Sequence, residues 1–376
     1  MSMSDYSLST NTLSPDAVFL SLLNRLCLGH RLNAHETEQA FGIIVEGSVS
    51  SERIAAFLAA MRVQGEGQEE LLGAVRALRA RMISLPTVPP DTIDVCGTGG
   101  DNYGTLNIST ATAFVLAALG IPVAKHGNRA VSSRTGASDV LAALGIAPLD
   151  NLEALSNQLT QHHLTFLAAP HHHPAMRYAA PVRKALGIRT LFNLVGPLVN
   201  PASVQRQLVG VFSTEWLGTI VDVLSLLGSH TVWAVCGQPE GECQGIDEIT
   251  LAGTTQVVAL DQGQKYHFTL TPEMAGLQQA PISDIKGDDA VYNAQALLAL
   301  LNGAHGAYRD TVVLNAACAL HVAGRTKLLI DGKIDTMALK ESVSYVSRPL
   351  DDGSALAVLT SLRTSSASTH APNVTG

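Results

Sequence analysis

The chain has 376 residues and 46% hydrophobic content, which is enough for two domains with a sizeable core. Its formal net charge is −8, whereas nucleic-acid-binding proteins usually carry a basic surplus, so this balance argues against a large nucleic-acid footprint. The N-terminus lacks the basic and apolar regions of a secretory signal, and the most apolar run, 111–124, is too short to span a bilayer. Five scattered cysteines without a CxxC pair favour reduced thiols, so we expect a cytoplasmic protein with no membrane partner.

Residues 14–86 predict a small all-helical domain. Ser14 precedes a proline, which is typical of a helix start, and Asn33 with Glu36 has the spacing of a capping box. Apolar residues recur at helical spacing up to residue 82 with no strand between them. A cluster of prolines then ends the helical pattern and predicts a linker.

From residue 91 onward, short β-type runs alternate with helices such as 109–120 and 138–145. This rhythm predicts an α/β domain with a central, mostly parallel sheet flanked by helices, and ligands outside the carboxyl ends of the strands. The strand candidates are 92–96, 121–124, 164–168, 208–212, 231–235 and 256–260. Because the two ends of the chain are polar, we expect flexible tails at 1–13 and 364–376.

A glycine-rich loop, GTGGD, follows the first of these strands at residues 97–101. Glycines let backbone N–H groups approach an anion, but the loop has neither the Walker nor the dinucleotide-binding spacing, so alone it is weak evidence. Hydroxyls and an amide at Thr105, Asn107, Ser109 and Thr110 then surround a predicted helix start, where free N–H groups favour phosphate. Helix capping explains one of these residues but not the whole polar cluster.

A second loop, KHGNRAVSSRTGASD, follows the next strand at residues 125–139. It places Lys125, Arg129 and Arg134 within ten residues of one another in an acidic chain, together with several hydroxyls. The alternative is a solvated surface loop. The two loops together would suit a ligand with two separate phosphate groups. The adjacent carboxylates Asp247 and Glu248 would suit Mg²⁺, whereas in isolation the motif favours a solvated acidic turn.

Four motifs in this order resemble the anthranilate phosphoribosyltransferases of tryptophan biosynthesis. They are GTGGD-x5-NIST, KHGNR-x2-SS, HPAM-x5-VR-x5-RT-x-FN-x2-GP and DEI, and the resemblance runs from about residue 16 to about residue 345. It implies a helical domain that includes a return segment at 173–199, and an α/β donor domain made of 91–172 and 200–363. It also implies a site at the hinge between the domains and a homodimer formed through the helical domain.

The resemblance also implies a role for individual positions of this chain. The phosphoribosyl pyrophosphate contacts would be Gly97, Gly100, Asp101, Thr105, Asn107, Ser109, Thr110, Lys125, His126, Gly127, Asn128, Arg129, Ser132 and Ser133. The anthranilate contacts would be Gly97, Asn128 and Arg183. Two Mg²⁺ ions per subunit would be held by Ser109, Asp247 and Glu248. Ala137 stands where many family members have a serine that touches the donor, so that contact is not carried over.

The implied reaction moves ribose 5-phosphate from phosphoribosyl pyrophosphate to the amine of anthranilate. Arg183 would bind the acceptor carboxylate through a two-point fork. His126 is a candidate proton acceptor. The alternative is that His126 is a turn residue that only contacts the substrate. Two other functions stay open, namely a pyrimidine nucleoside phosphorylase-like enzyme and a non-catalytic paralogue that binds nucleic acid.

Overall fold

The computed structural model describes residues 14–127 and 135–369, and the chain divides into two compact units. The smaller unit contains Met1–Ala80 and Ala175–Leu191, and the larger contains Arg81–Pro174 and Phe192–Gly376. The predicted return segment, 173–199, is therefore longer than the segment 175–191 of the smaller unit. The physical reason is that His173 and Val199 hold each other inside the larger unit, where the imidazole Nε2 donates to the Val199 carbonyl at 2.9 Å.

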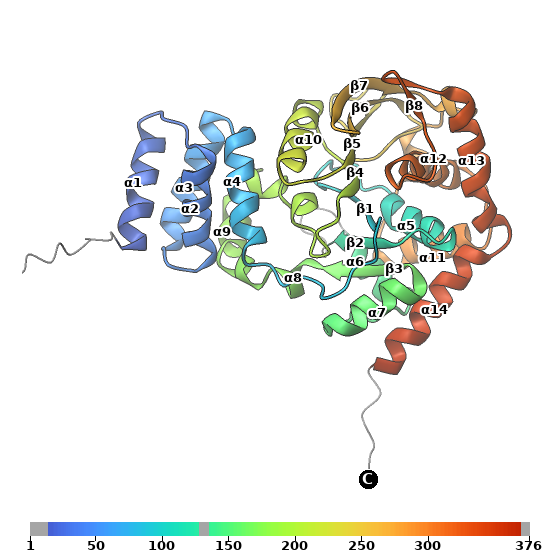
Figure 1. The fold of residues 1–376 in the computed structure, drawn as a ribbon, viewed down its shortest axis with the longest axis horizontal. Coiled ribbons are helices and arrows are strands. Elements are labelled where there is room, and N and C mark those ends of the chain that lie inside the picture. The colour runs from blue at the N-terminus through green and yellow to red at the C-terminus, as the bar shows by residue number, and fades with distance from the viewer. Residues whose placement is uncertain (1–13, 128–134, 370–376) are drawn as a thin grey trace, which may run out of the picture. The chain divides into compact units, whose positions relative to one another are not determined.

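The smaller unit is all-helical, as predicted (Figure 1). Both expected helix starts are present, because Ser14 accepts from the Ala17 amide and Asn33 forms a reciprocal capping box with Glu36. Aromatic packing joins α1 to α3, with the Phe19 and Phe57 ring centroids 5.0 Å apart. The helices of this unit are α1 (Pro15–Cys27), α2 (Ala34–Val45), α3 (Ser51–Gln64), α4 (Gln68–Arg79) and α9 (Ala180–Leu186).

The larger unit is built on a seven-stranded sheet with the order β3-β2-β1-β4-β5-β6-β7. The pairs from β3 to β5 are parallel, whereas β6 and β7 are antiparallel, which confirms the predicted fold class. The strands of this sheet are β1 (Ile93–Gly97), β2 (Val123–Gly127), β3 (Leu164–Ala168), β4 (Arg206–Gly210), β5 (Thr231–Pro239), β6 (Gly253–Asp261) and β7 (Gln264–Leu270). A separate hairpin pairs β8 (Leu329–Ile330) with β9 (Lys333–Ile334).

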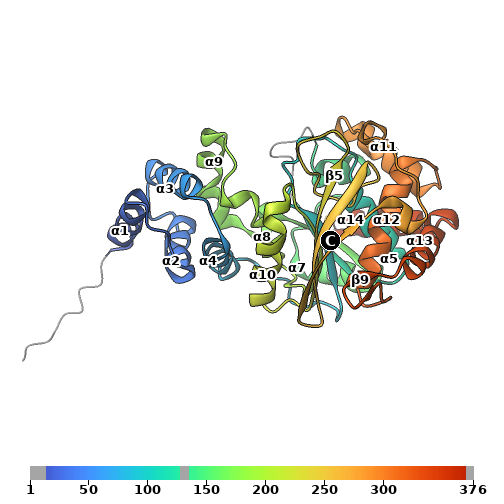
Figure 2. The same cartoon turned by 90° about the horizontal axis from the view of Figure 1, so that it is seen from above.

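Helices cover both faces of this sheet, and Figure 2 shows α10 on one side with α5, α12 and α13 on the other. The main core lies under α5 and α12, where Ile93, Val95 and Trp233 of the strands are buried. Because both faces are covered, the parallel strands β1, β2 and β4 are buried along nearly their whole length rather than at alternate positions. The helices of this unit are α5 (Ile108–Ala118), α6 (Ala137–Ala143), α7 (Leu152–His162), α8 (Ala169–His172), α10 (Leu217–Leu226), α11 (Ala290–Leu301), α12 (Ala307–Val322), α13 (Thr336–Asp351) and α14 (Ser354–Thr369).

Several sequence-based boundaries differ from the structure. The strand expected at 121–124 is Val123–Gly127, and that expected at 208–212 is Arg206–Gly210, because pairing with neighbouring strands sets where a ladder ends. The polar tail expected from residue 364 is helical to Thr369, so this part of the prediction is wrong. Tertiary contacts explain the difference, since Ser365 accepts a hydrogen bond from Gln158 and Ser366 is buried.

Within the described residues, no helix is both long enough and apolar enough to cross a lipid bilayer.

Candidate functional site

The candidate site lies at the carboxyl ends of β1 and β4, where the strand order reverses direction. Strands β1, β2 and β3 run outward on one side of this point, and β4 and β5 on the other. Loops that leave two such strands diverge and open a crevice, which is where open α/β sheets bind ligands. Gly97 and Gly210 are the last residues of the two strands and lie opposite each other in the ladder.

An acidic segment, residues 245–249, rests directly on these strand ends. A Cβ atom added to Gly210 would lie 1.5 Å from the Asp247 carbonyl oxygen, and one added to Gly97 would lie 2.2 Å from the Asp247 carboxylate. Gly237 of β5 has the same role, because its Cβ would lie 2.7 Å from the Glu248 carbonyl oxygen. Three glycines on three adjacent strands therefore give the acidic segment the space that it occupies.

Backbone amides bind both carboxylates of this segment. The Gly99 amide donates to Asp247 Oδ2 at 2.6 Å, and the Ser109 amide donates to Glu248 Oε1 at 3.2 Å. Ser109 lies in the first turn of α5, where free amides and the helix dipole favour negative charge. These two hydrogen bonds join the glycine-rich loop and the start of α5 to the acidic segment.

The carboxyl groups here are crowded. Burial, followed by the nearby charge of Asp247, raises the pKa of both Asp101 and Glu248 to about 8. The charge of Lys125 acts in the opposite direction on the pKa of Glu248, so its ammonium lies within electrostatic reach. A set of acidic oxygens this close together is one that a divalent cation would stabilise.

The oxygen ligands at this position suit Mg²⁺ that is shared with a substrate, rather than a metal ion held by protein ligands alone. Mg²⁺ commonly binds through one or two carboxylates together with substrate phosphates and water. Asp247 and Glu248 provide that number, whereas residues 14–127 and 135–369 contain no group of three His, Cys, Asp or Glu side chains that could hold a metal. A metal at this position would therefore depend on the phosphate oxygens of a ligand.

The rest of the glycine-rich loop is anchored by contacts that the sequence did not reveal. The Tyr103 hydroxyl donates to the carbonyl of Gln244, the residue directly before the acidic segment, at 2.6 Å. Thr105 forms an isolated bridge with Lys286, and the Gly287 amide donates to the Gly104 carbonyl at 2.8 Å. These contacts fix the path of the chain between β1 and α5.

Asn107 and Thr110 have different surroundings from those that the motif alone suggests. Asn107 is the N-cap residue of α5 but its side chain caps no amide, and its Oδ1 accepts from Asn293 at 3.1 Å instead. Thr110 is 1% exposed, and its hydroxyl has no hydrogen-bond partner among the described residues. Gly100 lies in the loop with φ +79°, a conformation that favours glycine.

At the end of β2, Lys125 and His126 are buried beside a fully buried carboxylate, Asp94 of β1. Asp94 accepts from the Asn200 amide at 2.7 Å and from the His126 backbone amide at 3.3 Å. Burial raises the pKa of Asp94, and the charge of Lys125 and these hydrogen bonds oppose that increase. The Asp94 network thus holds the first residues of the second loop, although nothing in the sequence pattern singled this aspartate out.

His126 is held in one tautomer. Its Nδ1 lies 2.9 Å from the Gly196 carbonyl, which can only accept, so Nδ1 carries the proton and Nε2 is the free acceptor. Nε2 is buried and has no partner among the described residues. Burial is the main reason that the pKa of His126 falls to about 3, so the ring is neutral and weakly basic at neutral pH.

The remaining predicted residues are placed as follows. Gly127 ends β2, and a Cβ atom added there would lie 3.7 Å from the Cβ of Ala137, so no bulky group fills this point. Arg183 lies on α9 of the smaller unit, and burial lowers its pKa. The four residues Asn128, Arg129, Ser132 and Ser133 lie outside the described residues.

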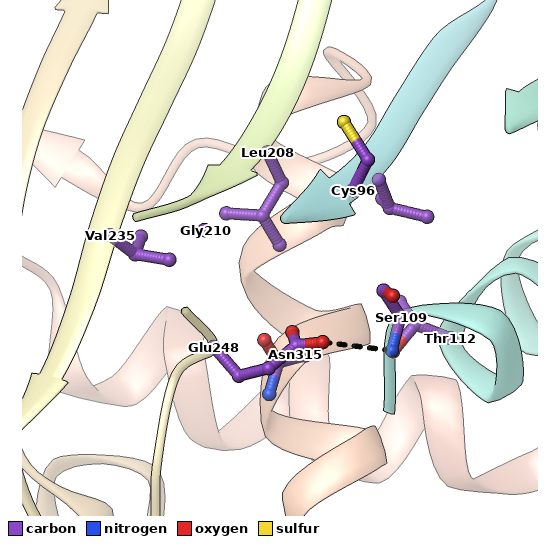
Figure 3. A pocket seen from close by; sticks show the side chains of 9 residues that line it. Cys96, Ser109, Thr112, Leu208, Gly210, Val235, Glu248 and Asn315 are labelled. Atoms are coloured by element: carbon purple, nitrogen blue, oxygen red, sulfur yellow. Dashed lines mark hydrogen bonds between the residues drawn. The ribbon is translucent and has the colours of Figure 1, made fainter. Parts of the chain in front are cut away.

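A small cavity opens between the acidic segment and α5, and Figure 3 shows the side chains that surround it. Ser109, Thr112 and Glu248 line it together with Asn315 of α12. Thr112 and Asn315 are further residues that sequence reasoning missed. The available signal for Asn315 was a single amide within the otherwise apolar run 312–320, which is costly to bury unless it is hydrogen-bonded.

Comparison with known proteins agrees with this geometry. Residues 89–356 match the family model for the α/β domain of a glycosyl transferase family, and residues 20–82 match its helical bundle domain. The chain is 55% identical over 354 residues to the anthranilate phosphoribosyltransferase of Gluconobacter oxydans (strain 621H), covering 94% of this chain and 96% of the relative. It is 47% identical over 331 residues to that of Brucella suis biovar 1 (strain 1330), covering 88% and 93%.

Solved structures give the same result. The anthranilate phosphoribosyltransferase of Thermus thermophilus superposes with a TM-score of 0.81 at 36% identity, covering 92% of this chain and 99% of that one. The Saccharomyces cerevisiae enzyme in complex with PRPP and Mg superposes with a TM-score of 0.83 at 26% identity, covering 94% and 98%. Because the family model and the curated relatives match along most of the sequence, this chain belongs to the anthranilate phosphoribosyltransferase family.

Proposed function

We propose that the protein transfers the 5-phosphoribosyl group from phosphoribosyl pyrophosphate to the amine of anthranilate in tryptophan biosynthesis, giving N-(5-phosphoribosyl)anthranilate and pyrophosphate. One observation carries the proposal. Asp247 lies on the glycines that end β1 and β4, and Glu248 lies on Gly237 of β5. The Asp247 carboxylate accepts from the Gly99 amide of the glycine-rich loop, and the Glu248 carboxylate accepts from the Ser109 amide in the first turn of α5. Carboxylates lie there beside the backbone amides of a glycine-rich loop and of a helix start, a combination that suits a phosphorylated substrate bound together with a cation.

The donor would contact these described residues: Gly97, Gly100, Asp101, Thr105, Asn107, Ser109, Thr110, Lys125, His126 and Gly127. The predicted contacts at Asn128, Arg129, Ser132 and Ser133 are kept as part of the same proposal. Amides at a helix start and glycines in a loop can approach phosphate oxygens without side chains between them. Lys125 adds a positive charge near Glu248.

Ser109, Asp247 and Glu248 would hold Mg²⁺, with two ions per subunit. The cation would stabilise the negative charge of the departing pyrophosphate. The yeast enzyme noted above, which was solved with PRPP and Mg, supports this assignment for a related protein. Because burial raises the pKa of Asp101 and Glu248 to about 8, a cation that binds there at neutral pH would release protons from these carboxyl groups.

Anthranilate would be recognised by Gly97, Asn128 and Arg183. A guanidinium can bind the carboxylate with two parallel hydrogen bonds, which orients the ring and its amine. The amine attacks C1 of the ribose as pyrophosphate leaves, and it then loses a proton. His126 Nε2 has a free lone pair for that proton, and because its pKa is about 3 it would act only on a strongly acidic arylammonium.

The test is a fluorescence assay of anthranilate consumption with and without phosphoribosyl pyrophosphate and Mg²⁺. The double variant Asp247→Ala/Glu248→Ala should lose metal-dependent turnover while it keeps its fold. Glu240→Ala/Glu242→Ala is a matched control, because it removes two exposed carboxylates from the same β5–β6 connection. Full activity in the first variant would contradict the metal assignment.

The reported relatives give no support to a nucleoside phosphorylase or a nucleic-acid-binding paralogue. We further propose a cytoplasmic homodimer formed through the helical domain, and two functional domains at 14–86 with 173–199 and at 91–172 with 200–363. The five cysteines have free thiols, which suits a reducing compartment. Sedimentation of the purified protein over a range of concentrations would test the dimer.

A further inference from the structure

Asn315 is a buried amide at the middle of α12. The helix is buried over most of its length, and Asn315 itself is 1% exposed. An amide in such a place costs free energy unless its donors and its acceptor all find partners. The partners that Asn315 finds are therefore informative about why this helix carries it.

The amide of Asn315 binds both backbone groups of one residue in the acidic segment. Its Nδ2 donates to the Ile249 carbonyl at 2.8 Å, and its Oδ1 accepts from the Ile249 amide at 3.2 Å. The second Nδ2 proton goes to the Thr311 carbonyl, 2.9 Å away and one turn earlier in α12. All three polar positions of the side chain are occupied, and two of them hold Ile249.

Ile249 directly follows Asp247 and Glu248, and a second anchor directly precedes them. The Ile246 amide and carbonyl exchange hydrogen bonds with the Gly237 carbonyl and amide, both at 2.9 Å. Asp247 and Glu248 thus lie between two residues, Ile246 and Ile249, whose backbone groups are both hydrogen-bonded. The anchor at Ile246 is main chain on both sides, whereas the anchor at Ile249 depends on one side chain.

We propose that Asn315 is a positioning residue that sets where Asp247 and Glu248 lie. Figure 3 shows Asn315 beside Glu248, with Ser109 across from them at the other side of the cavity. If the Ile249 backbone lost this side-chain partner, the hydrogen bond that ties the Glu248 carboxylate to α5 would be its 3.2 Å contact with the Ser109 amide. This inference rests on the proposed function, because it assigns Asn315 to the proposed metal carboxylates.

The test compares Asn315→Leu, which keeps the size of the side chain and removes its polar atoms, with Asn315→Ser, which keeps one hydroxyl. Thr311→Val is the matched control. It removes a buried hydroxyl from the same helix, where Thr311 Oγ1 donates to the Ala307 carbonyl at 2.7 Å, and leaves the acidic segment untouched. If Asn315→Leu does not fold, Asn315→Ser carries the comparison.

Two measurements do not depend on turnover. The first is hydrogen–deuterium exchange of residues 245–250 in the metal-free protein. The second is Mn²⁺ binding, followed by electron paramagnetic resonance with and without phosphoribosyl pyrophosphate. In the Asn315 variants we expect faster exchange and Mn²⁺ binding that is weaker by at least about tenfold, which is the factor that loss of one buried hydrogen bond gives. We expect neither change in the Thr311→Val control.

Kinetics then separate positioning from general damage. In the Asn315 variants the Mg²⁺ concentration for half-maximal rate should rise about tenfold or more, while kcat at saturating Mg²⁺ stays within about threefold of the wild type. Equal exchange and equal Mn²⁺ affinity in the Asn315 and Thr311 variants would overturn the proposal. If the wild-type protein bound no Mn²⁺, the proposed metal role would fail. Faster exchange of residues 245–250 in the Asn315 variants would then still show that the hydrogen bonds from Asn315 hold Ile249 in place.

Discussion

Replacing Gly210 with alanine should displace the acidic segment. Gly210 is not one of the glycines with positive φ, so its backbone tolerates alanine and only the space around it is restrictive. The added Cβ would lie 1.5 Å from the Asp247 carbonyl oxygen, and ordinary contact begins at 3.4 Å, so the backbone there must move by about 2 Å. A misplacement of about 1 Å can cost 10²-fold in rate, and overpacking a core typically costs about 1–3 kcal/mol of stability.

We therefore expect Gly210→Ala to fold with a loss of about 1–3 kcal/mol in the free energy of unfolding, and to lose at least about 100-fold in kcat/KM. Urea denaturation gives the first quantity, and the anthranilate fluorescence assay gives the second. Gly218→Ala is the control, because a Cβ at that position in α10 meets no atom within 4 Å and should stabilise the helix by about 0.5–1 kcal/mol. A kcat/KM within about threefold of wild type for Gly210→Ala would refute the reasoning.

Three further predictions concern residues around the site. Arg183→Ala should raise the KM for anthranilate far more than that for phosphoribosyl pyrophosphate, and equal effects on both would count against its carboxylate role. Asp94→Leu leaves the donors of Asn200 and His126 without their acceptor, so the free energy of unfolding should fall by about 3–5 kcal/mol in denaturant titration; a loss below about 1 kcal/mol would contradict the buried network. Burial lowers the pKa of His173 from 6.5 to about 4. Between pH 6.5 and pH 4 the unfolded chain therefore binds a proton at His173 and the folded protein does not, so the free energy of unfolding falls as the pH drops through this range. The full effect is about 3 kcal/mol, and His173→Gln should reduce the difference in unfolding free energy between pH 7 and pH 4 by that amount; an unchanged pH dependence would show that His173 is not the cause.

The sequence by itself determined the local features of this protein. The cap at Ser14 and the capping box of Asn33 depend on residues within one helical turn, so they could be recognised from spacing alone. The glycine-rich loop, the polar cluster at the start of α5 and the adjacent carboxylates were recognised in the same way. Their order along the chain was enough to indicate the family, because each motif carries its chemistry in a few consecutive residues.

Only the tertiary structure decided how these features meet. Gly97 and Gly210 are far apart in the chain, and the parallel pairing of β1 with β4 is what brings them together under Asp247. Asn315 is visible in the sequence as a lone amide in an apolar run, but its contact with Ile249 follows from the way the larger unit folds around α12. Strand pairing and helix packing depend on contacts between distant residues, and a single sequence contains no local signal for them.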